Sequence, residues 1–284
     1  MSAATRLAWR CWTPIAARAA RAYIAGPSLG DALVTAGAAA KRGSAASICP
    51  WDSAADSPRR VADAYVAALR GIAACGLDCT LSIKAPSLRY SRDLLDELLD
   101  AARAGGTGLH FDSMAPDTVD PTWPLIEYAA DRHAPVGCTL PARWSRSMVD
   151  AERVATLGIN VRIVKGQWDD PRVESHAVRR RYLILIERLA GRARSIGVAT
   201  HDPQLAHDAL TCLIESGTRC ELELLFGLPM RDQIDRAESL KVPVRIYIPY
   251  GQAWLPYGLS QVRQNPRILW WTARDWLLGR TGLR

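Results

Sequence analysis

The chain of 284 residues lacks several features that would assign it to a common class of protein. It has no run of about 18 uninterrupted apolar residues, so a membrane-spanning helix is not expected. It has neither a GxGxxG nor a GxxxxGKS/T motif, which leaves Rossmann-type and P-loop nucleotide binding without support. Its net charge of +7 comes with no recognised nucleic-acid-binding signature, so nucleic acid is not an expected partner.

Acidic residues are absent before Asp31, whereas four arginines precede it. This composition suits a secretion signal, an organelle transit peptide or a basic surface helix. A secretion signal needs a continuous apolar stretch, which the arginines interrupt, and a transit peptide would need a linker before the expected structure begins. We therefore favour the surface helix and assign residues 1–43 to a basic helical segment.

The seven cysteines are an odd number, and most of them lie in apolar runs. That distribution is typical of buried free thiols in a reducing compartment, so we expect a cytoplasmic protein. Cys75 and Cys79 form the only closely spaced pair, and no second pair follows at zinc-finger spacing. No metal site is expected.

Short apolar and β-branched runs recur along the chain, and segments with apolar residues at helical spacing separate them. Strands that alternate with helices imply parallel βαβ units, and eight such units close a barrel. The eight runs cover residues 45–49, 79–84, 108–112, 135–140, 160–165, 196–201, 220–225 and 244–248. The sequence therefore predicts an α/β protein of the (βα)8 TIM type, with its barrel in residues 44–284.

In such a barrel the working side chains lie at the carboxyl ends of the strands. A metal site for hydrolysis, built from His110, Asp112, His201 and Glu223, is one interpretation of the polar residues found there. We disfavour it because the first strand lacks the HxH pair that such enzymes carry. Barrel mouths also collect polar residues without function. The remaining strand-end residues are Trp51, Asp52, Lys84, Pro141, Lys165, Gln167, Phe226, Tyr247 and Tyr250.

Arg162 and Lys165 place two cations near the end of the fifth strand, beside Gly166. A glycine permits close backbone approach, so this group suits a phosphate or an electron-rich ring system. The alternative is a surface salt bridge to Asp169 or Asp170.

Six segments, in this order, resemble the motifs of the proline dehydrogenases, which are flavin-dependent (βα)8 barrels. They read LSIKAPSL, LHFDSM, VRIVKGQW, VATHDP, ELELLFGL and VRIYIPYGQAWLPY, within a resemblance that runs from about Ala22 to the end of the chain. The resemblance implies noncovalently bound FAD over the strand ends. It places Arg162 beside flavin N5, and the other implied cofactor contacts are Val164, Lys165, Gly166, Thr200 and His201. The implied catalytic and substrate-pocket residues are Lys84, Asp112 and Tyr247, with Lys84 paired to Asp112.

The chain departs from the family at two places. Pro141 stands where the family has a glutamine that touches the flavin, and a proline has no N–H to donate. Ser260 and Gln261 stand where the family has consecutive arginines that hold the proline carboxylate. Neutral side chains cannot neutralise a carboxylate, and the candidate replacements are Arg263, one turn further along, and Arg89 or Arg143 from other loops.

The resemblance implies oxidation of a small secondary amine or imino acid, proline or a proline-like compound, to an imine by hydride transfer to the flavin. The alternative is a barrel that has lost catalysis and acts as a binding or regulatory protein. We expect a quinone as electron acceptor and peripheral contact with the inner face of the membrane. The aromatic and cationic residues of the stretch 267–280 motivate the membrane contact, although packing of that stretch on the barrel explains them as well.

Overall fold

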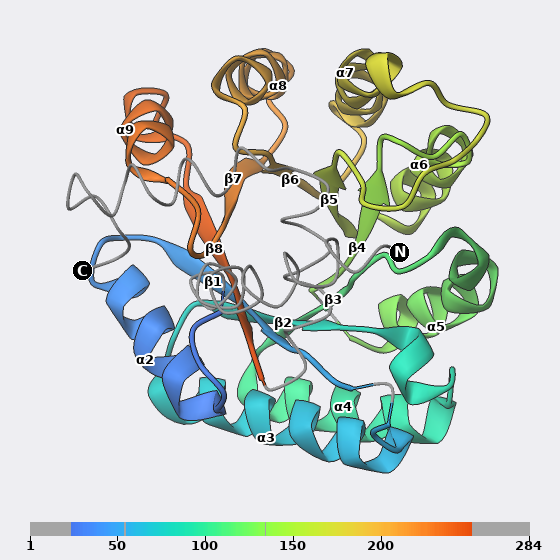
Figure 1. Ribbon diagram of the computed structural model, residues 1–284, viewed down its shortest axis with the longest axis vertical. Helices are drawn as coiled ribbons and strands as arrows, with labels where there is room; N and C mark the ends of the chain where they lie inside the picture. The colour runs from blue at the N-terminus through green and yellow to red at the C-terminus, as the bar shows by residue number, and fades with distance from the viewer. Residues whose placement is uncertain (1–23, 54, 134, 252–284) are drawn as a thin grey trace, which may run out of the picture.

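The eight expected strands form a closed, all-parallel barrel in the computed structural model (Figure 1), which describes residues 24–53, 55–133 and 135–251. Each strand pairs with the next in sequence, and β8 pairs with β1 to close the barrel. The prediction of eight strands and a (βα)8 barrel is confirmed, with boundaries that differ by no more than two residues. The strands are β1 Ala45–Pro50, β2 Cys79–Ile83, β3 Gly108–Phe111, β4 Val136–Pro141, β5 Asn160–Val164, β6 Ser195–Ala199, β7 Cys220–Leu225 and β8 Val244–Tyr250.

Helices form an outer ring around the barrel (Figure 1). Seven of them, α3 to α9, each follow one strand, while α2 precedes β1 and lies beside β1 and β8. They are α2 Leu29–Ala40, α3 Pro58–Cys75, α4 Arg92–Gly105, α5 Val119–Arg132, α6 Ser147–Leu157, α7 Val178–Leu189, α8 Pro203–Glu215 and α9 Arg231–Ser239. Short 3-10 turns cover Ala85–Leu88 (η1), Pro116–Thr118 (η2) and Ser175–Ala177 (η3). None of the described helices is long and apolar enough to cross a membrane.

The helix boundaries follow from capping residues in the sequence. α4 begins after Ser91, whose hydroxyl accepts a hydrogen bond from the Leu94 N–H. It ends at Gly106, whose φ of 64° is a left-handed conformation that glycine adopts without strain. The amphipathic pattern of this helix buries Leu95 and Leu98 against the barrel.

The two faces of the barrel wall differ in chemistry. Outward-facing strand residues such as Ile48, Leu81 and Ile163 are fully buried beneath the helices and form the hydrophobic core. Inward-facing residues, which alternate with them along each strand, include Ser47, Arg162 and many other polar side chains. The barrel interior is therefore a polar cluster enclosed by an aliphatic shell, and that cluster lies beneath the candidate site.

Candidate active site

A buried arginine lies at the centre of the barrel, below its mouth. Arg162 on β5 is 4% exposed, and its Nε donates to Glu223 Oε2 at 2.5 Å. Its Nη1 donates to Asp112 Oδ1 at 2.8 Å and to Ser82 Oγ at 3.4 Å, and its Nη2 donates to Ser47 Oγ at 3.2 Å. Described side chains thus accept four hydrogen bonds from the five N–H groups of the guanidinium. The alternative of a surface salt bridge to Asp169 or Asp170 is not found, because those carboxylates bond to Arg143 and Arg172.

Asp112 and Tyr247 complete this group from neighbouring positions around the barrel. Tyr247 donates its hydroxyl to Asp112 Oδ2 at 2.7 Å, and its ring centroid lies 5.1 Å from Arg162 Cζ. Burial raises the pKa of Tyr247 well above its ordinary value, so the phenol keeps its proton and remains a donor. The Asp112 side chain is 13% exposed, so the group reaches solvent at its carboxylate. The structure brings Asp112, Arg162 and Tyr247 into contact with one another.

Lys84 does not pair with Asp112, contrary to the expectation. Its Nζ donates to Asp52 Oδ1 at 2.7 Å and to the Pro50 carbonyl at 2.9 Å. Asp52 also accepts a hydrogen bond from Ser87 Oγ at 2.6 Å. Asp52 follows β1 and Asp112 follows β3, and both of these strands lie beside β2, which Lys84 follows. The two oxygens of Asp112 are bound by Arg162 and Tyr247, whereas Asp52 is available to Lys84. Burial lowers the pKa of Lys84, but the neighbouring Cys49, Tyr65 and Asp52 outweigh that effect and raise it, so the amine stays charged.

Gly166 and Lys165 form the corner that follows β5. The φ of Gly166 is +97°, and a Cβ at this position would lie 2.8 Å from Cβ of Pro141, so only glycine fits. Pro141 ends β4, and its carbonyl accepts from Ser147 Oγ at 2.6 Å. The Lys165 side chain is 44% exposed, with Nζ 3.3 Å from Asp202 Oδ2. The loop thus presents a half-exposed cation, paired with Asp202, at the mouth.

His201 joins the ends of β6 and β7. Its Nε2 accepts a hydrogen bond from the Leu225 N–H at 2.9 Å, so the ring proton is on Nδ1, which donates to the Pro229 carbonyl at 3.2 Å. Burial lowers the pKa of His201 to about 4, and the charge of Lys165 acts in the same direction. The imidazole is therefore neutral, with both nitrogens engaged by the protein. Thr200 beside it is buried, and its hydroxyl accepts from the Asp202 N–H at 3.1 Å.

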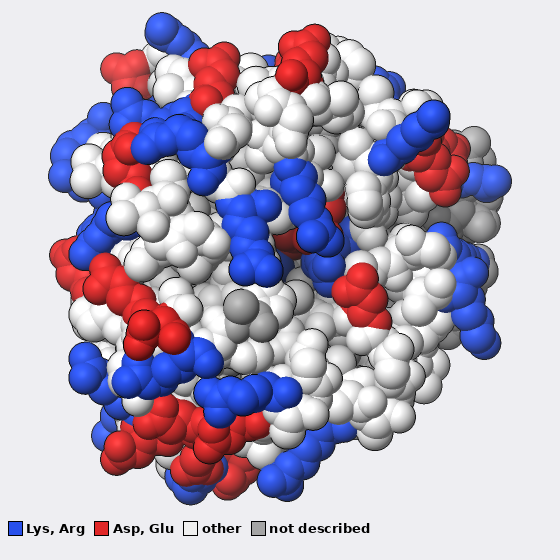
Figure 2. Space-filling model, turned by 180° about the vertical axis from the view of Figure 1, so that it is seen from behind, with Lys and Arg blue, Asp and Glu red and all other residues white. Residues whose placement is uncertain are grey.

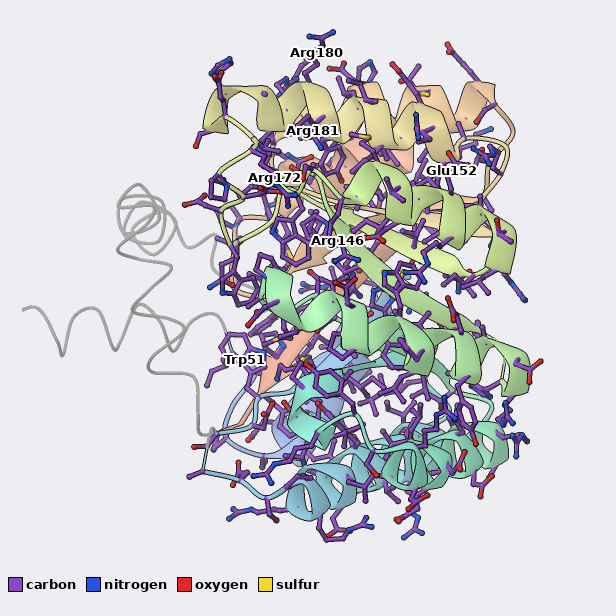
Figure 3. All side chains as sticks on the ribbon, turned by 90° about the vertical axis from the view of Figure 1, so that its right-hand side faces the viewer. Trp51, Arg146, Glu152, Arg172, Arg180 and Arg181 are labelled. Carbon is purple, nitrogen blue, oxygen red and sulfur yellow. The ribbon has the colours of Figure 1, made fainter. Side chains whose placement is uncertain are left out.

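The loops after β4 and β5 are bonded to one another. Arg143 donates to the Gly166 carbonyl at 3.2 Å and pairs with Asp169 at 2.5 Å. Trp144 Nε1 donates to the Trp168 carbonyl at 2.9 Å. Arg143 is thus engaged in holding the loop of Gly166, which argues against its expected use as a replacement for the family's paired arginines. In Figure 3, Trp51 and Arg172 lie on the same side of the barrel, at the carboxyl ends of the strands.

Other residues of the predicted site have separate positions. Val164 is the last residue of β5, and its carbonyl accepts from the Ala142 N–H at 2.8 Å. Arg89, the remaining candidate on a described loop, is exposed and has a left-handed φ of 48°. Ser260, Gln261 and Arg263 lie outside the described residues, as does most of the predicted basic segment 1–43.

Glu223 lies in the candidate site, although the sequence suggested it only as a strand-end residue and a ligand of the disfavoured metal site. Its carboxylate is 6% exposed and lies against Arg162. A signal was available, because Glu221 and Glu223 alternate with Leu222 and Leu224 in one strand. With the leucines outward, both acids must face the interior, where a buried carboxylate requires a cationic partner. The residues considered for a metal are otherwise engaged: His110 Nε2 lies 2.9 Å from Thr139 Oγ1, and Asp112 and Glu223 bond to Arg162.

Comparison with known proteins agrees with this fold. No protein-family model matches the chain. It is 25% identical to proline dehydrogenase from Deinococcus radiodurans over 272 residues, covering 87% of this chain and 86% of that protein. It is 24% identical to proline dehydrogenase 1 from Bacillus subtilis subsp. natto over 267 residues, covering 87% of each.

Solved structures of proline utilization A (PutA) share the fold. The protein from Bdellovibrio bacteriovorus, inactivated by N-propargylglycine, superimposes with a TM-score of 0.75 at 15% identity, covering 87% of this chain and 32% of that one. The Corynebacterium freiburgense protein gives a TM-score of 0.71 at 15% identity, covering 96% and 34%. The chain thus spans about a third of these proteins.

The closed eight-stranded barrel is a (βα)8 barrel with the architecture found in the PutA structures. Within that class, the chain is a distant homologue of the proline dehydrogenases.

Proposed function

We propose that this chain is an FAD-dependent dehydrogenase that oxidises a small secondary amine or imino acid to an imine. The observation that carries the proposal is the group of Arg162, Asp112 and Tyr247 just below the barrel mouth, which reaches solvent at Asp112, in a distant homologue of the proline dehydrogenases. Proline, or a proline-like compound whose acidic end is altered or held differently, is the proposed substrate.

The described residues fit a flat flavin ring at the mouth. Gly166 has no Cβ, which lets Pro141 and Arg143 pack directly against the corner that follows β5, so the loops after β4 and β5 form one surface at the mouth. The guanidinium of Arg162 retains one N–H beyond the four that described side chains bind. Lys165 adds an exposed cation. The residues that would hold FAD are Arg162, Val164, Lys165, Gly166, Thr200 and His201, and bound FAD would supply the acceptor for a hydride from the substrate's α-carbon.

The protein's own contribution is orientation and charge. Tyr247 holds Asp112 through Oδ2, while Arg162 holds the same carboxylate through Oδ1, so this acid is fixed from both sides. A carboxylate fixed in this way can accept the N–H of a substrate amine and position its α-carbon. The amine must be unprotonated to lose a hydride, so activity should rise with pH as the amine deprotonates. The charge of Lys84 is balanced by Asp52, so Lys84 does not compete for the Asp112 carboxylate. Asp112 is therefore the acid that would face the substrate amine.

Purification of the full chain and measurement of its FAD content and affinity test the proposal. The protein should be yellow, or should bind added FAD in a calorimeter, and should lose its colour when reduced anaerobically by a cyclic secondary amine. Arg162→Ala should weaken FAD binding at least tenfold. Arg180→Ala is the matched control, because Arg180 is exposed on the outer side of α7, away from the mouth (Figure 3).

Circular dichroism and thermal unfolding of both variants separate loss of FAD from loss of the fold. A colourless wild-type protein with no heat of FAD binding would overturn the proposal. That result would favour the binding or regulatory alternative, which Pro141 at the expected glutamine position also suits.

A further inference from the structure

We infer that Glu223 is a positioning residue for the redox site: its carboxylate offsets the charge of Arg162 and makes bound FAD harder to reduce. This inference rests on the proposed function, because it concerns the flavin that the mouth would hold. It assigns a role to a side chain that contacts Arg162 and reaches the cofactor only through it.

The contact between the two groups is close and enclosed. Glu223 Oε2 lies 2.5 Å from Arg162 Nε, and the two residues are 6% and 4% exposed. Charges that water does not screen interact strongly at this separation. The barrel also provides room for the carboxylate, because a Cβ on Gly197 of β6 would lie 2.1 Å from Glu223 Oε1. Glu223 is therefore part of the built interior of the barrel and not a side chain that happens to lie near the site.

The charge count of the group gives the direction of the effect. One cation, Arg162, bonds to two carboxylates, Asp112 and Glu223, so the three groups together carry one excess negative charge when all are ionised. Two electrons and one proton added to FAD leave one negative charge on the ring. An unopposed arginine would stabilise that charge, whereas an arginine already neutralised by Glu223 stabilises it less. The equilibrium therefore moves toward oxidised FAD.

A purely structural role for Glu223 makes a different prediction. If Glu223 only held the guanidinium in place, Glu223→Gln would preserve that function, because the amide oxygen of glutamine accepts the same hydrogen bond from Nε. The substitution removes the charge and keeps the shape and the acceptor. The reduction potential thus distinguishes an electrostatic role from a merely structural one.

The chain offers a matched control on the same strand. Glu221 is also paired with an arginine, through Arg245 Nε at 2.7 Å. It points into the same interior but lies two residues nearer the amino end of β7, about 7 Å further from the mouth at ~3.3 Å per residue. In Figure 2, which shows the molecule from behind, acidic atoms are recessed between cationic side chains near the centre of that face. Glu221→Gln removes the same charge at the greater distance.

The experiment measures the midpoint potential of bound FAD by reductive titration with dithionite and a reference dye, in wild type, Glu223→Gln and Glu221→Gln. Glu223→Gln should favour reduced FAD at least tenfold, which equals about 30 mV for a two-electron couple. Its affinity for sulfite, which adds to N5 and places negative charge on the ring, should also rise about tenfold. Glu221→Gln should give a clearly smaller change in both quantities.

If Glu223→Gln fails to fold, Glu223→Ala takes its place: it removes the same charge, and the potential should again rise. Equal potentials in wild type and the variant of Glu223, or a shift to lower potential, would overturn the inference while FAD binding still supported the proposed function. Absence of FAD binding in the wild type would instead overturn the proposed function itself.

Discussion

The neutral, enclosed imidazole of His201 should make the protein lose stability as the pH falls below about 6.5. The Nε2 atom accepts the Leu225 N–H, so a second ring proton would break this hydrogen bond and place a charge next to Lys165. Burial lowers the pKa of His201 in the folded protein from 6.5 to about 4. In the unfolded chain the imidazole is expected to titrate near its ordinary value of about 6.5.

The sign and size of the effect follow from these two pKa values. The unfolded chain binds the proton first, so the stability that neutral His201 contributes is complete above about pH 6.5 and is lost progressively between 6.5 and 4. The difference of 2.5 between the two values, at about 1.4 kcal/mol per pKa unit, gives about 3 kcal/mol. That figure is an upper value, because part of the His201 ring reaches solvent.

Urea unfolding of wild type and His201→Gln, at pH steps from 8 to 4, measures this difference. The free energy of unfolding of the wild type, minus that of the variant, should fall by up to about 3 kcal/mol between pH 7.5 and 4. Contributions from other titrating groups are common to both proteins and cancel. His176→Gln, at an exposed histidine, should give a curve parallel to the wild type. Parallel curves for wild type and His201→Gln would refute the reasoning.

Three further predictions concern other parts of the chain. Gly197→Ala should destabilise the protein by about 1–3 kcal/mol in urea unfolding, because its Cβ would collide with Glu223, and adding Glu223→Ala should recover part of the loss. A Gly197→Ala variant with the free energy of unfolding of the wild type would contradict this packing. L-proline should be a poor substrate, and the double variant Ser260→Arg/Gln261→Arg should raise kcat/KM for proline at least tenfold, because the arginines supply charge-assisted hydrogen bonds to the carboxylate. Efficient turnover of proline by the wild type would contradict this prediction. The protein should sediment with anionic vesicles at low salt and be released at high salt, as the aromatic and cationic stretch 267–280 suggests; absence from the vesicle pellet at low salt would exclude membrane contact.

Much of the fold was predictable because the sequence pattern of each strand is local. In the runs around Val161 and Ile246, apolar residues alternate with polar ones, as expected for a barrel wall with one apolar and one polar face. Glycine or polar capping residues separate these runs from the helices. Arg162 and Asp112 stand near the ends of two of these runs. Since parallel strands bring their carboxyl ends to one edge, residues far apart in the sequence were expected together, and they are.

The pairings within the site were harder to predict because they depend on distances that sequence order does not contain. Lys84 has acids on both neighbouring strands, and it pairs with Asp52 because Arg162 and Tyr247 already bind the carboxylate of Asp112. The importance of Glu223 was missed for a related reason. A glutamate in a leucine-rich strand shows that a partner must exist, but only the closed barrel shows that the partner is Arg162, 61 residues earlier in the chain.

The charged interior itself argues for a function. A buried cluster of Arg162, Asp112 and Glu223 is a poor way to stabilise a barrel, because desolvating three charges offsets most of their mutual attraction, and aliphatic residues of similar volume would serve as well. Accommodating the cluster also requires a glycine in the wall, because a Cβ on Gly197 would collide with the Glu223 carboxylate. A side chain at Gly197 that a purely structural barrel could pack is therefore given up for the charged group. The arrangement makes physical sense where fixed charges act on something bound above them, and that is the place where the Arg162 guanidinium and the Asp112 carboxylate meet the mouth.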